Sequence, residues 1–337
     1  MAAQRMTEKK QKEIISALFG KKEDDIALQD YRDYFELYHE ELRVEASYHD
    51  TPKVRDIVTA VVIGLSGNGE VKRRLVRRFL TDTFPDEDED DIERYIDLAL
   101  RVWLMVNSRE KSLDTSHARR WGDEETLSMF VRSFFRRCET PPTAWTVPVL
   151  AHPLTVASLE RFSGITIQWT SYLAEHLKFN HGARTLKVFA NKRWLLDVTD
   201  WMRRTSQDDP APIPIPLHIL EETIKTLDAL FPWNDETSDF LDKHSKDFHL
   251  LTPPSDTPID LQEFTFYRDR LLEIITEFQT PPRDWRTIWK DRRNPMQFWT
   301  FWLGLLIVIL TLIFGFLSAL IAGLQLRIAQ HPPPPGP

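Results

Sequence analysis

The chain lacks the features of an exported or disulfide-stabilised protein. It contains one cysteine, Cys138, so no disulfide can form within a single chain, and it has no Asn-x-Ser/Thr sequon for glycosylation. Both absences are typical of a polypeptide that stays in a reducing compartment. The opening residues, MAAQRMTEKKQKE, include no apolar stretch of signal-peptide length, so we expect no export signal there.

The chain also lacks a surplus of positive charge. The chain has 43 Lys and Arg against 51 Asp and Glu, which gives a formal net charge of -8. Because affinity for a phosphate backbone depends on a surplus of Lys and Arg, we expect no nucleic-acid partner for the chain as a whole.

One short segment is nevertheless rich in basic residues, and we call it the basic patch. It comprises Lys72, Arg73, Arg74, Arg77 and Arg78. Three interpretations of this patch remain open: pairing with the acidic run at residues 86–91, contact with anionic lipid headgroups, and contact with nucleic acid. The patch is therefore a candidate surface for lipid or for an acidic partner.

A phosphate-binding loop is absent. The stretch GLSGNGEVKRR has two glycines at the separation found in such a loop, but Glu70 and Val71 stand where Lys and then Ser or Thr are needed. A carboxylate at that place repels a triphosphate. We interpret residues 67–69 as a turn between two helices, with Asn68 as the cap of the second.

Metal-binding and catalytic motifs are absent as well. The acidic run DEDEDD at residues 86–91 has Asp91 where a calcium loop needs a glycine, and none of the ten histidines has the His-Glu-x-x-His spacing of a zinc site. There is no Gly-x-Ser-x-Gly elbow, and no histidine lies near Cys138 in the sequence. We therefore expect no metal site, no cofactor and no catalytic residue, and we expect that the chain is not an enzyme.

What the chain does contain is one long apolar segment near its C-terminus. It runs for 27 residues from Phe298 to Leu324, and no charged side chain lies between Arg293 and Arg327. As a helix it would reach about 40 Å, which exceeds the roughly 30 Å hydrocarbon core of a bilayer. This length predicts a transmembrane helix rather than the buried helix of a soluble core.

The flanks of this segment predict its orientation. The preceding side carries five basic residues, namely Arg283, Arg286, Lys290, Arg292 and Arg293, whereas only Arg327 follows the segment. The positive-inside rule therefore places the N-terminal region in the cytosol. We expect interfacial anchors at Trp285, Trp289, Arg292, Arg293, Trp299 and Trp302. The remaining residues, 325–337, form a short Pro-rich tail, so the pattern is that of a tail-anchored protein in the endoplasmic reticulum or plasma membrane.

One side of the predicted span is made of small residues. Gly315, Ala319 and Gly323 recur every fourth residue, a spacing that lets two helix backbones approach closely. This helix-pairing strip predicts self-association within the bilayer.

The remainder of the chain is predicted to be mainly α-helical. We expect helices at residues 8–19, 29–46, 53–65 and 68–84, a fifth bearing Ile92, Ile96 and Trp103 on one side, and further helices at 123–137, 216–231 and 258–279. Residues 165–169 and 185–188 alternate as strands do, and we expect the second to return along the first as a hairpin. Between them, Thr170 is expected to cap a helix ending near Phe179, so that this segment is a small winged-helix-like α+β insert.

These patterns divide the chain into six segments. They are an N-terminal helical bundle (1–110), a helix with a Pro-containing connector (111–153), the winged-helix-like α+β unit (154–205), a helical region leading to the membrane (206–297), the transmembrane helix (298–324) and the Pro-rich tail (325–337).

Part of the chain resembles a known group of proteins. The runs ITIQWTSYLAEHLKF, PLHILEETIKTLDALFP, FYRDRLLEIITEFQ and WKDRRNPMQFWTFWLGLLIVILTLIFG, within about residues 150–325, are similar to those of tail-anchored helical proteins of filamentous fungi. The resemblance implies the fold and the span. It implies no reaction, ligand or catalytic residue, because none has been assigned to that group.

Three classes of function follow from these observations. The first is a membrane-tethered interaction module whose cytosolic helical domain binds other proteins, with the lipid bilayer and unknown cytosolic proteins as partners. The second is a membrane-acting effector whose span oligomerises. The third is an enzyme whose site is assembled from residues that no motif reveals.

Overall fold

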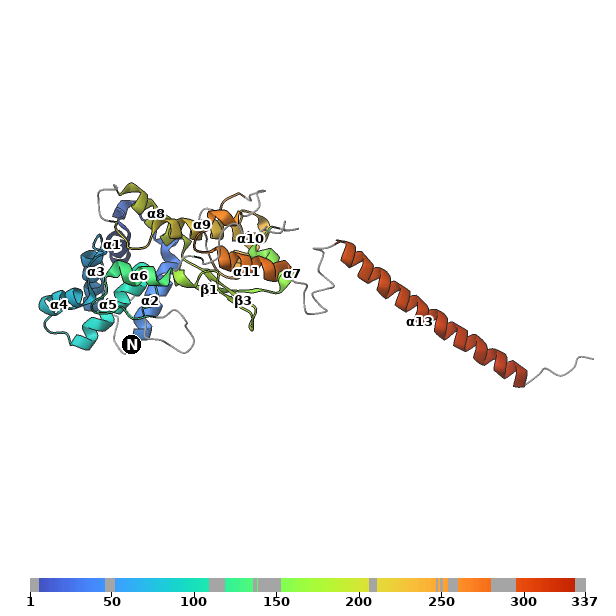
Figure 1. Ribbon diagram of the computed structural model, residues 1–337. Helices are drawn as coiled ribbons and strands as arrows, with labels where there is room; N and C mark the ends of the chain where they lie inside the picture. Colours follow the sequence, from blue (N-terminus) through green and yellow to red (C-terminus); the bar gives the residue numbers. More distant parts are fainter. Residues whose placement is uncertain are drawn as a thin grey trace, which may run out of the picture. The chain divides into compact units, whose positions relative to one another are not determined.

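The structure is a computed structural model, and it describes residues 6–45, 52–108, 119–135, 138, 153–205, 211–246, 248, 251–253, 260–279 and 295–330. The chain divides into two compact units, Met1–Thr280 and Pro281–Pro337 (Figure 1). The predicted anchors Trp285, Trp289, Arg292 and Arg293, the Pro-rich tail after residue 330 and most of the connector 111–153 lie outside the described residues.

The first unit begins with six helices. They are α1 (Glu8–Phe19), α2 (Arg32–Glu45), α3 (Pro52–Leu65), α4 (Arg73–Thr83), α5 (Glu89–Leu104) and α6 (Leu127–Phe134). Short 3-10 turns lie elsewhere in the unit at Glu23–Asp25 (η1), Leu28–Tyr31 (η2) and Leu261–Glu263 (η5). All six helices were predicted. Helix α1 ends where expected, because Gly20 adopts the left-handed conformation (φ 63°) that residues with a Cβ disfavour.

Helix α5 is the centre of this helical part. Its residues from Leu98 to Leu104 are all buried, and it packs against α2, α3 and α4. A helix that is buried on nearly every side packs against neighbours on every side. Residues outside the apolar stripe seen in the sequence, such as Leu100 and Arg101, are therefore buried as well. The helix ends where Met105 turns into the left-handed conformation.

A small sheet follows, and its topology corrects the predicted hairpin. The strands are β1 (Thr166–Thr170), β2 (Phe179–Asn180) and β3 (Thr185–Phe189), in the order β1-β3-β2. Strand β3 pairs parallel to β1, with Ile167 opposite Leu186, and antiparallel to the short β2. The hairpin is therefore formed by β2 and β3, and the strand expected to return along β1 runs in the same direction.

The helix predicted after Thr170 is also wrong. Only the 3-10 turn η4 (Leu173–Glu175) forms there, because the backbone of this segment pairs with β3 instead of with itself. The Leu177 N–H donates to the Lys187 carbonyl (2.8 Å), and the Lys187 N–H donates to the Lys178 carbonyl (2.9 Å). These amides are unavailable for helical hydrogen bonds.

Five more helices complete the unit around the sheet. They are α7 (Val156–Ser163), α8 (Lys192–Arg204), α9 (Leu217–Leu230), α10 (Asp235–Lys243) and α11 (Arg268–Gln279). Helices α8 and α10 were not anticipated from the sequence. Buried side chains of the first six helices and of the α+β segment belong to one hydrophobic cluster, which extends from Met6 to Phe278, so these segments share a core.

The second unit consists of one long helix in the described residues, α13 (Pro295–Gln330). Together with the small three-stranded sheet, these helices confirm a mainly α fold with a long apolar helix near the C-terminus.

Candidate functional site

The basic patch begins one residue before α4. The predicted cap, Asn68, is not the N-cap; it lies in the turn that precedes the helix, and Lys72 takes the cap position without a side-chain hydrogen bond. The reason is tertiary: Val71 and Lys72 are extended against the start of α6, where the Leu127 N–H donates to the Val71 carbonyl (2.9 Å). An extended segment cannot begin the helix, so α4 starts only at Arg73.

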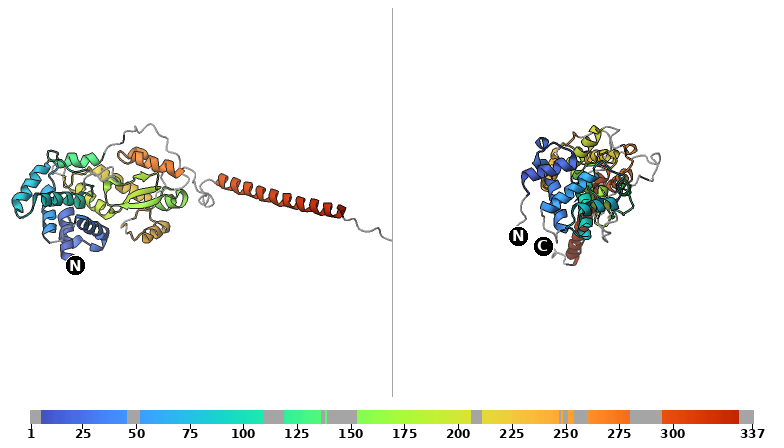
Figure 2. Two further views of the ribbon diagram at one scale, coloured as in Figure 1. Left: turned by 90° about the horizontal axis from the view of Figure 1, so that it is seen from below. Right: turned by 90° about the vertical axis from the view of Figure 1, so that its left-hand side faces the viewer.

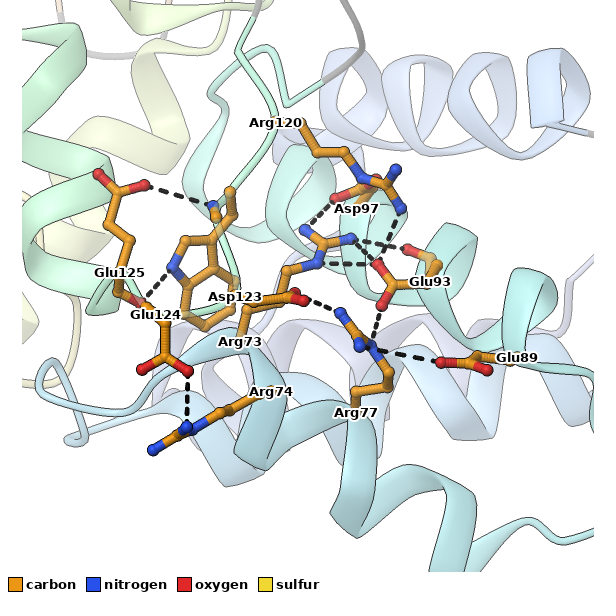
Figure 3. A network of polar contacts seen from close by, with 12 residues as sticks. Arg73, Arg74, Arg77, Glu89, Glu93, Asp97, Arg120, Asp123, Glu124 and Glu125 are labelled. Carbon is orange, nitrogen blue, oxygen red and sulfur yellow. Dashed lines mark hydrogen bonds and ion pairs between the residues drawn. The ribbon is translucent and has the colours of Figure 1, made fainter.

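Arg73 is the buried member of the patch. Its side chain is 1% exposed, and its guanidinium reaches Asp97 from one nitrogen (2.7 Å) and Glu93 from another (2.8 Å), both on α5 (Figure 3). A buried guanidinium is tolerated only when its charge and its donors are matched in this way. Arg73 therefore joins α4 to α5 and is not available to a partner.

Arg77 and Arg120 belong to the same network of ion pairs. Arg77 contacts Glu93 and Asp123 and lies 3.8 Å from Glu89, while Arg120 lies 2.9 Å from Glu93. Burial disfavours the charged form of Glu93, but the attraction of Arg73 and Arg77 outweighs burial and lowers the pKa of Glu93. The carboxylate of Glu93 thus stays ionised among three guanidinium groups.

Two further members of the patch share one exposed carboxylate. Lys72 and Arg74 lie 3.1 Å and 2.6 Å from the side chain of Glu124. Because all three side chains are well exposed, these pairs contribute little to stability. They do, however, neutralise part of the charge that a lipid headgroup or a nucleic acid would contact.

The basic patch is therefore mostly paired, although rarely with the acidic run. Among the described residues of the acidic run, Glu89 is the one that pairs with the patch, through Arg77. The other carboxylates that pair with the patch lie outside the run and are Glu93, Asp97, Asp123 and Glu124. A sequence signal for the true pairing exists. Arg73 and Arg77 are four residues apart, as are Glu93 and Asp97, so each pair lies on one face of its helix and the two faces can meet.

The outer face of α4 is different in character. Leu75 and Phe79, one turn apart, are 53% and 56% exposed. Arg78 beside them is also exposed, and it has no ion pair within the part of the chain that the structure describes. Helix α4 lies at the end of the first unit that is remote from the sheet (Figures 1 and 2). This apolar and basic surface, which we call the α4 outer face, was not recognised in the sequence because the spacing alone does not show which side of α4 packs on α5.

The second candidate feature is α13. The segment Trp299–Arg327 is long and apolar enough to cross a membrane, by length and composition, and its side chains are exposed almost throughout. Its 29 residues reach about 44 Å, against roughly 30 Å for the hydrocarbon core. Of the predicted interfacial residues, Trp299 and Trp302 lie near the start of this segment.

The helix-pairing strip lies within α13. Gly315, Ala319 and Gly323 follow one another at four-residue spacing in continuous helix, so they occupy one side. A Cβ added at Gly315 or Gly323 would meet no atom within 4 Å, so these glycines are not required by packing inside the chain. Their small size leaves the strip open to another helix.

Comparison with known proteins returns no relative: no protein-family model, no curated protein and no solved structure matches this chain. A functional proposal therefore has to rest on α13 and the α4 outer face.

Proposed function

We propose that this chain is a single-pass membrane protein of the tail-anchored type. In this proposal α13 spans a bilayer, residues 1–280 lie in the cytosol, and the α4 outer face binds a cytosolic protein. The observation that carries it is the exposed apolar length of Trp299–Arg327, because leaving such a surface in water is far less favourable than placing it in lipid.

The cytosolic placement is supported by the flanking charges. Five basic residues precede the span within residues 283–293, and one, Arg327, follows it. Such a bias keeps the more basic flank on the cytosolic side. The endoplasmic reticulum and the plasma membrane are the proposed locations.

The α4 outer face is proposed as the contact surface for a protein because of its composition. Two large apolar side chains at i and i+4 match the spacing by which one helix recognises another. Arg78, which has no ion pair among the described residues, favours a carboxylate on the partner. A lipid surface is less well matched, since Arg73, Arg77, Lys72 and Arg74 are already paired with carboxylates. The proposed partner is a helical protein segment with apolar residues flanked by an acidic residue.

Membrane insertion is tested by alkaline carbonate extraction of the full-length chain. We expect it to remain in the membrane pellet, and we expect a variant with Leu310→Arg and Phe314→Arg to be released, because two charges at the centre of the span oppose insertion. Release of the unmodified chain would contradict the proposal.

Orientation is tested with one substitution. Glu70→Ser creates an Asn-x-Ser sequon at Asn68, on an exposed turn of the first unit. We expect no glycan at this site, whereas a sequon-bearing tag attached after Pro337 should be glycosylated. A glycan on Asn68 would place residues 1–280 in the lumen and overturn the topology.

Partner binding is tested by site-specific photo-cross-linking in cells. A photoreactive amino acid at Phe79 should give discrete protein adducts, and the same group at the equally exposed Met129 on α6 should not. Arg78→Glu should reduce the adducts from position 79 about tenfold, since it repels the expected carboxylate. Equal adducts at both positions, or adducts with lipid alone, would exclude the α4 outer face as a protein-binding surface.

A further inference from the structure

The α4 outer face carries charge of both signs. Beside Leu75, Arg78 and Phe79 lies Asp82, which is exposed and has no ion pair or hydrogen bond with the described residues. The four residues stand at positions i, i+3, i+4 and i+7 of one helix, so they form a continuous stripe. This stripe presents two large apolar side chains, one cation and one carboxylate.

Arg78 and Asp82 do not pair with one another within α4. They are four residues apart, yet no ion pair joins them in the part of the chain that the structure describes. The order of the charges explains this, because a pair in which the acidic residue comes first is the more favourable one along a helix. On α5, where Asp91 precedes Arg94, the two do form an ion pair. The cation and the carboxylate of the stripe are therefore both available to another molecule.

The stripe matches the partner inferred for it. That partner is a helical segment with apolar residues flanked by an acidic residue, and α4 itself presents Leu75 and Phe79 one turn apart, followed by Asp82. A surface that carries both halves of a complementary pattern can bind its own copy about a two-fold axis. Helix α4 lies at one end of the first unit (Figure 2), so contact through it does not require the sheet to approach the second copy.

The charges also determine how two such helices can pair. In a parallel pair, Arg78 of one copy lies opposite Arg78 of the other, and the like charges repel. In an antiparallel pair centred between Arg78 and Phe79, Arg78 lies opposite Phe79 of the second copy and three residues from its Asp82. Three residues are about 4.5 Å along a helix, a distance that an arginine side chain spans. Leu75 likewise lies three residues from the Phe79 that faces it.

We propose that the α4 outer face binds the same face of a second copy of this chain, with the two α4 helices antiparallel. Leu75 and Phe79 of the two copies pack together, and each Arg78 pairs with Asp82 of the other copy. A guanidinium is also attracted to the face of an aromatic ring, so Arg78 gains from the facing Phe79 as well. The inference rests on the proposed function, because it names the partner of the surface assigned there.

The area of this contact determines where it should be observed. Helix α4 has 11 residues, so two such helices bury less surface than a stable complex needs. Stable complexes begin at roughly 1,200 Å² of buried surface. The pairing is therefore weak between freely diffusing chains. Anchoring in one membrane raises the effective concentration of two copies, so the full-length chain should pair through α4 in membranes.

The test is photo-cross-linking in cells that express two epitope-tagged versions of the full-length chain. A photoreactive phenylalanine analogue at position 79 of one version should give an adduct that contains the other version, and the same group at the equally exposed Met129 should not. Adducts are the readout because pairing through α13 would also bring the two tags together. If position 79 gives adducts only with a different protein, the proposed function stands and this inference is overturned. If it gives no protein adduct, both are overturned.

Charge reversal provides the most specific variants. Arg78→Glu or Asp82→Arg, present in both versions, should each lower the adduct about tenfold, because like charges then face one another. Arg78→Glu in one version and Asp82→Arg in the other should restore the adduct, because both pairs between the copies regain opposite charges. Inside each α4 the reversed charges remain unmatched, so restoration cannot come from pairing within one helix. A mixture that restores nothing would refute the antiparallel pair.

Two further variants serve as controls. Asp239→Arg makes the same change at an exposed position on α10 and should leave the adduct unchanged. Asp82→Asn removes the charge with little change in shape, and it should lower the adduct about threefold even if charge reversal impairs folding. Equal losses from Asp239→Arg and Asp82→Arg would show that net charge governs the adduct, which contradicts the proposal, as would an undiminished adduct in Asp82→Asn.

Discussion

The guanidinium of Arg73 lies 2.7 Å from the carboxylate of Asp97, and it is almost completely withdrawn from water. A residue that the sequence presents as part of a basic surface is thus an internal link between α4 and α5. Its partners Glu93 and Asp97 have the same four-residue spacing on α5 as Arg73 and Arg77 have on α4.

Replacing Arg73 should lower the stability of the fold far more than replacing an exposed arginine of the patch. We expect Arg73→Met to lower the free energy of unfolding by roughly 3 kcal/mol, because Glu93 and Asp97 then keep buried charge with less compensation. The matched change Arg78→Met, on the exposed side of the same helix, should alter it by less than about 0.5 kcal/mol. Urea denaturation of the full-length variants in micelles measures both, and similar losses would show that Arg73 is not the buried link.

Glu222 should be essential to the start of α11. Glu222→Gln replaces an acceptor of backbone amides by a group that is half donor, so we expect a loss of roughly 2 kcal/mol in the free energy of unfolding. Its neighbour Glu221 forms an exposed pair with Arg203 (2.7 Å), and Glu221→Gln should cost about 0.5 kcal/mol or less. The same urea experiment compares the two, and a larger loss for Glu221→Gln would contradict this assignment.

His176 should make the fold sensitive to acid. It is fully buried: its Nδ1 accepts from the Phe189 N–H (3.1 Å), which leaves Nε2 to donate to the Thr226 hydroxyl (2.7 Å). Burial, with a smaller contribution from Arg270, lowers the pKa of His176 well below its ordinary value of 6.5. The unfolded chain therefore binds a proton below about pH 6.5 that the folded chain does not, and stability should fall by about 1.4 kcal/mol per pH unit below that point.

This pH dependence is measured as the slope of unfolding free energy between about pH 6.5 and 5. His176→Gln should reduce the slope by about one proton even if it also lowers stability overall. An unchanged slope in His176→Gln would mean that this side chain takes up its proton in the folded state as well.

The helix-pairing strip predicts self-association of α13. Ala319→Ile should reduce the signal of a membrane two-hybrid reporter about fivefold or more, because a branched side chain holds the two backbones apart. Leu317→Ile, a change to the same residue on the opposite side of α13, should have little effect. Equal reporter signals from the unmodified α13 and from Ala319→Ile would contradict the prediction.

The positions of most helices could be predicted because they follow from local signals. Thr7 caps α1, Gly20 ends it, and the apolar spacing of α5 and α9 indicates the buried side. The strands β1 and β3 were recognised from alternation, but their relative direction was not, since alternation is identical in parallel and antiparallel pairs. Helix α8 was missed because Lys192 and Arg193 in its first turn oppose the usual signal of a helix start.

The sequence by itself determined the apolar helix near the C-terminus, the mainly helical character of the remainder and the charge bias around that helix, because these depend on composition and on spacing along the chain. Only the tertiary structure decided which arginines of the basic patch are buried and which face of α4 is exposed. These outcomes depend on contacts between residues that are far apart in the sequence, and the pairing of Arg73 with Asp97 exists only once those segments have packed together.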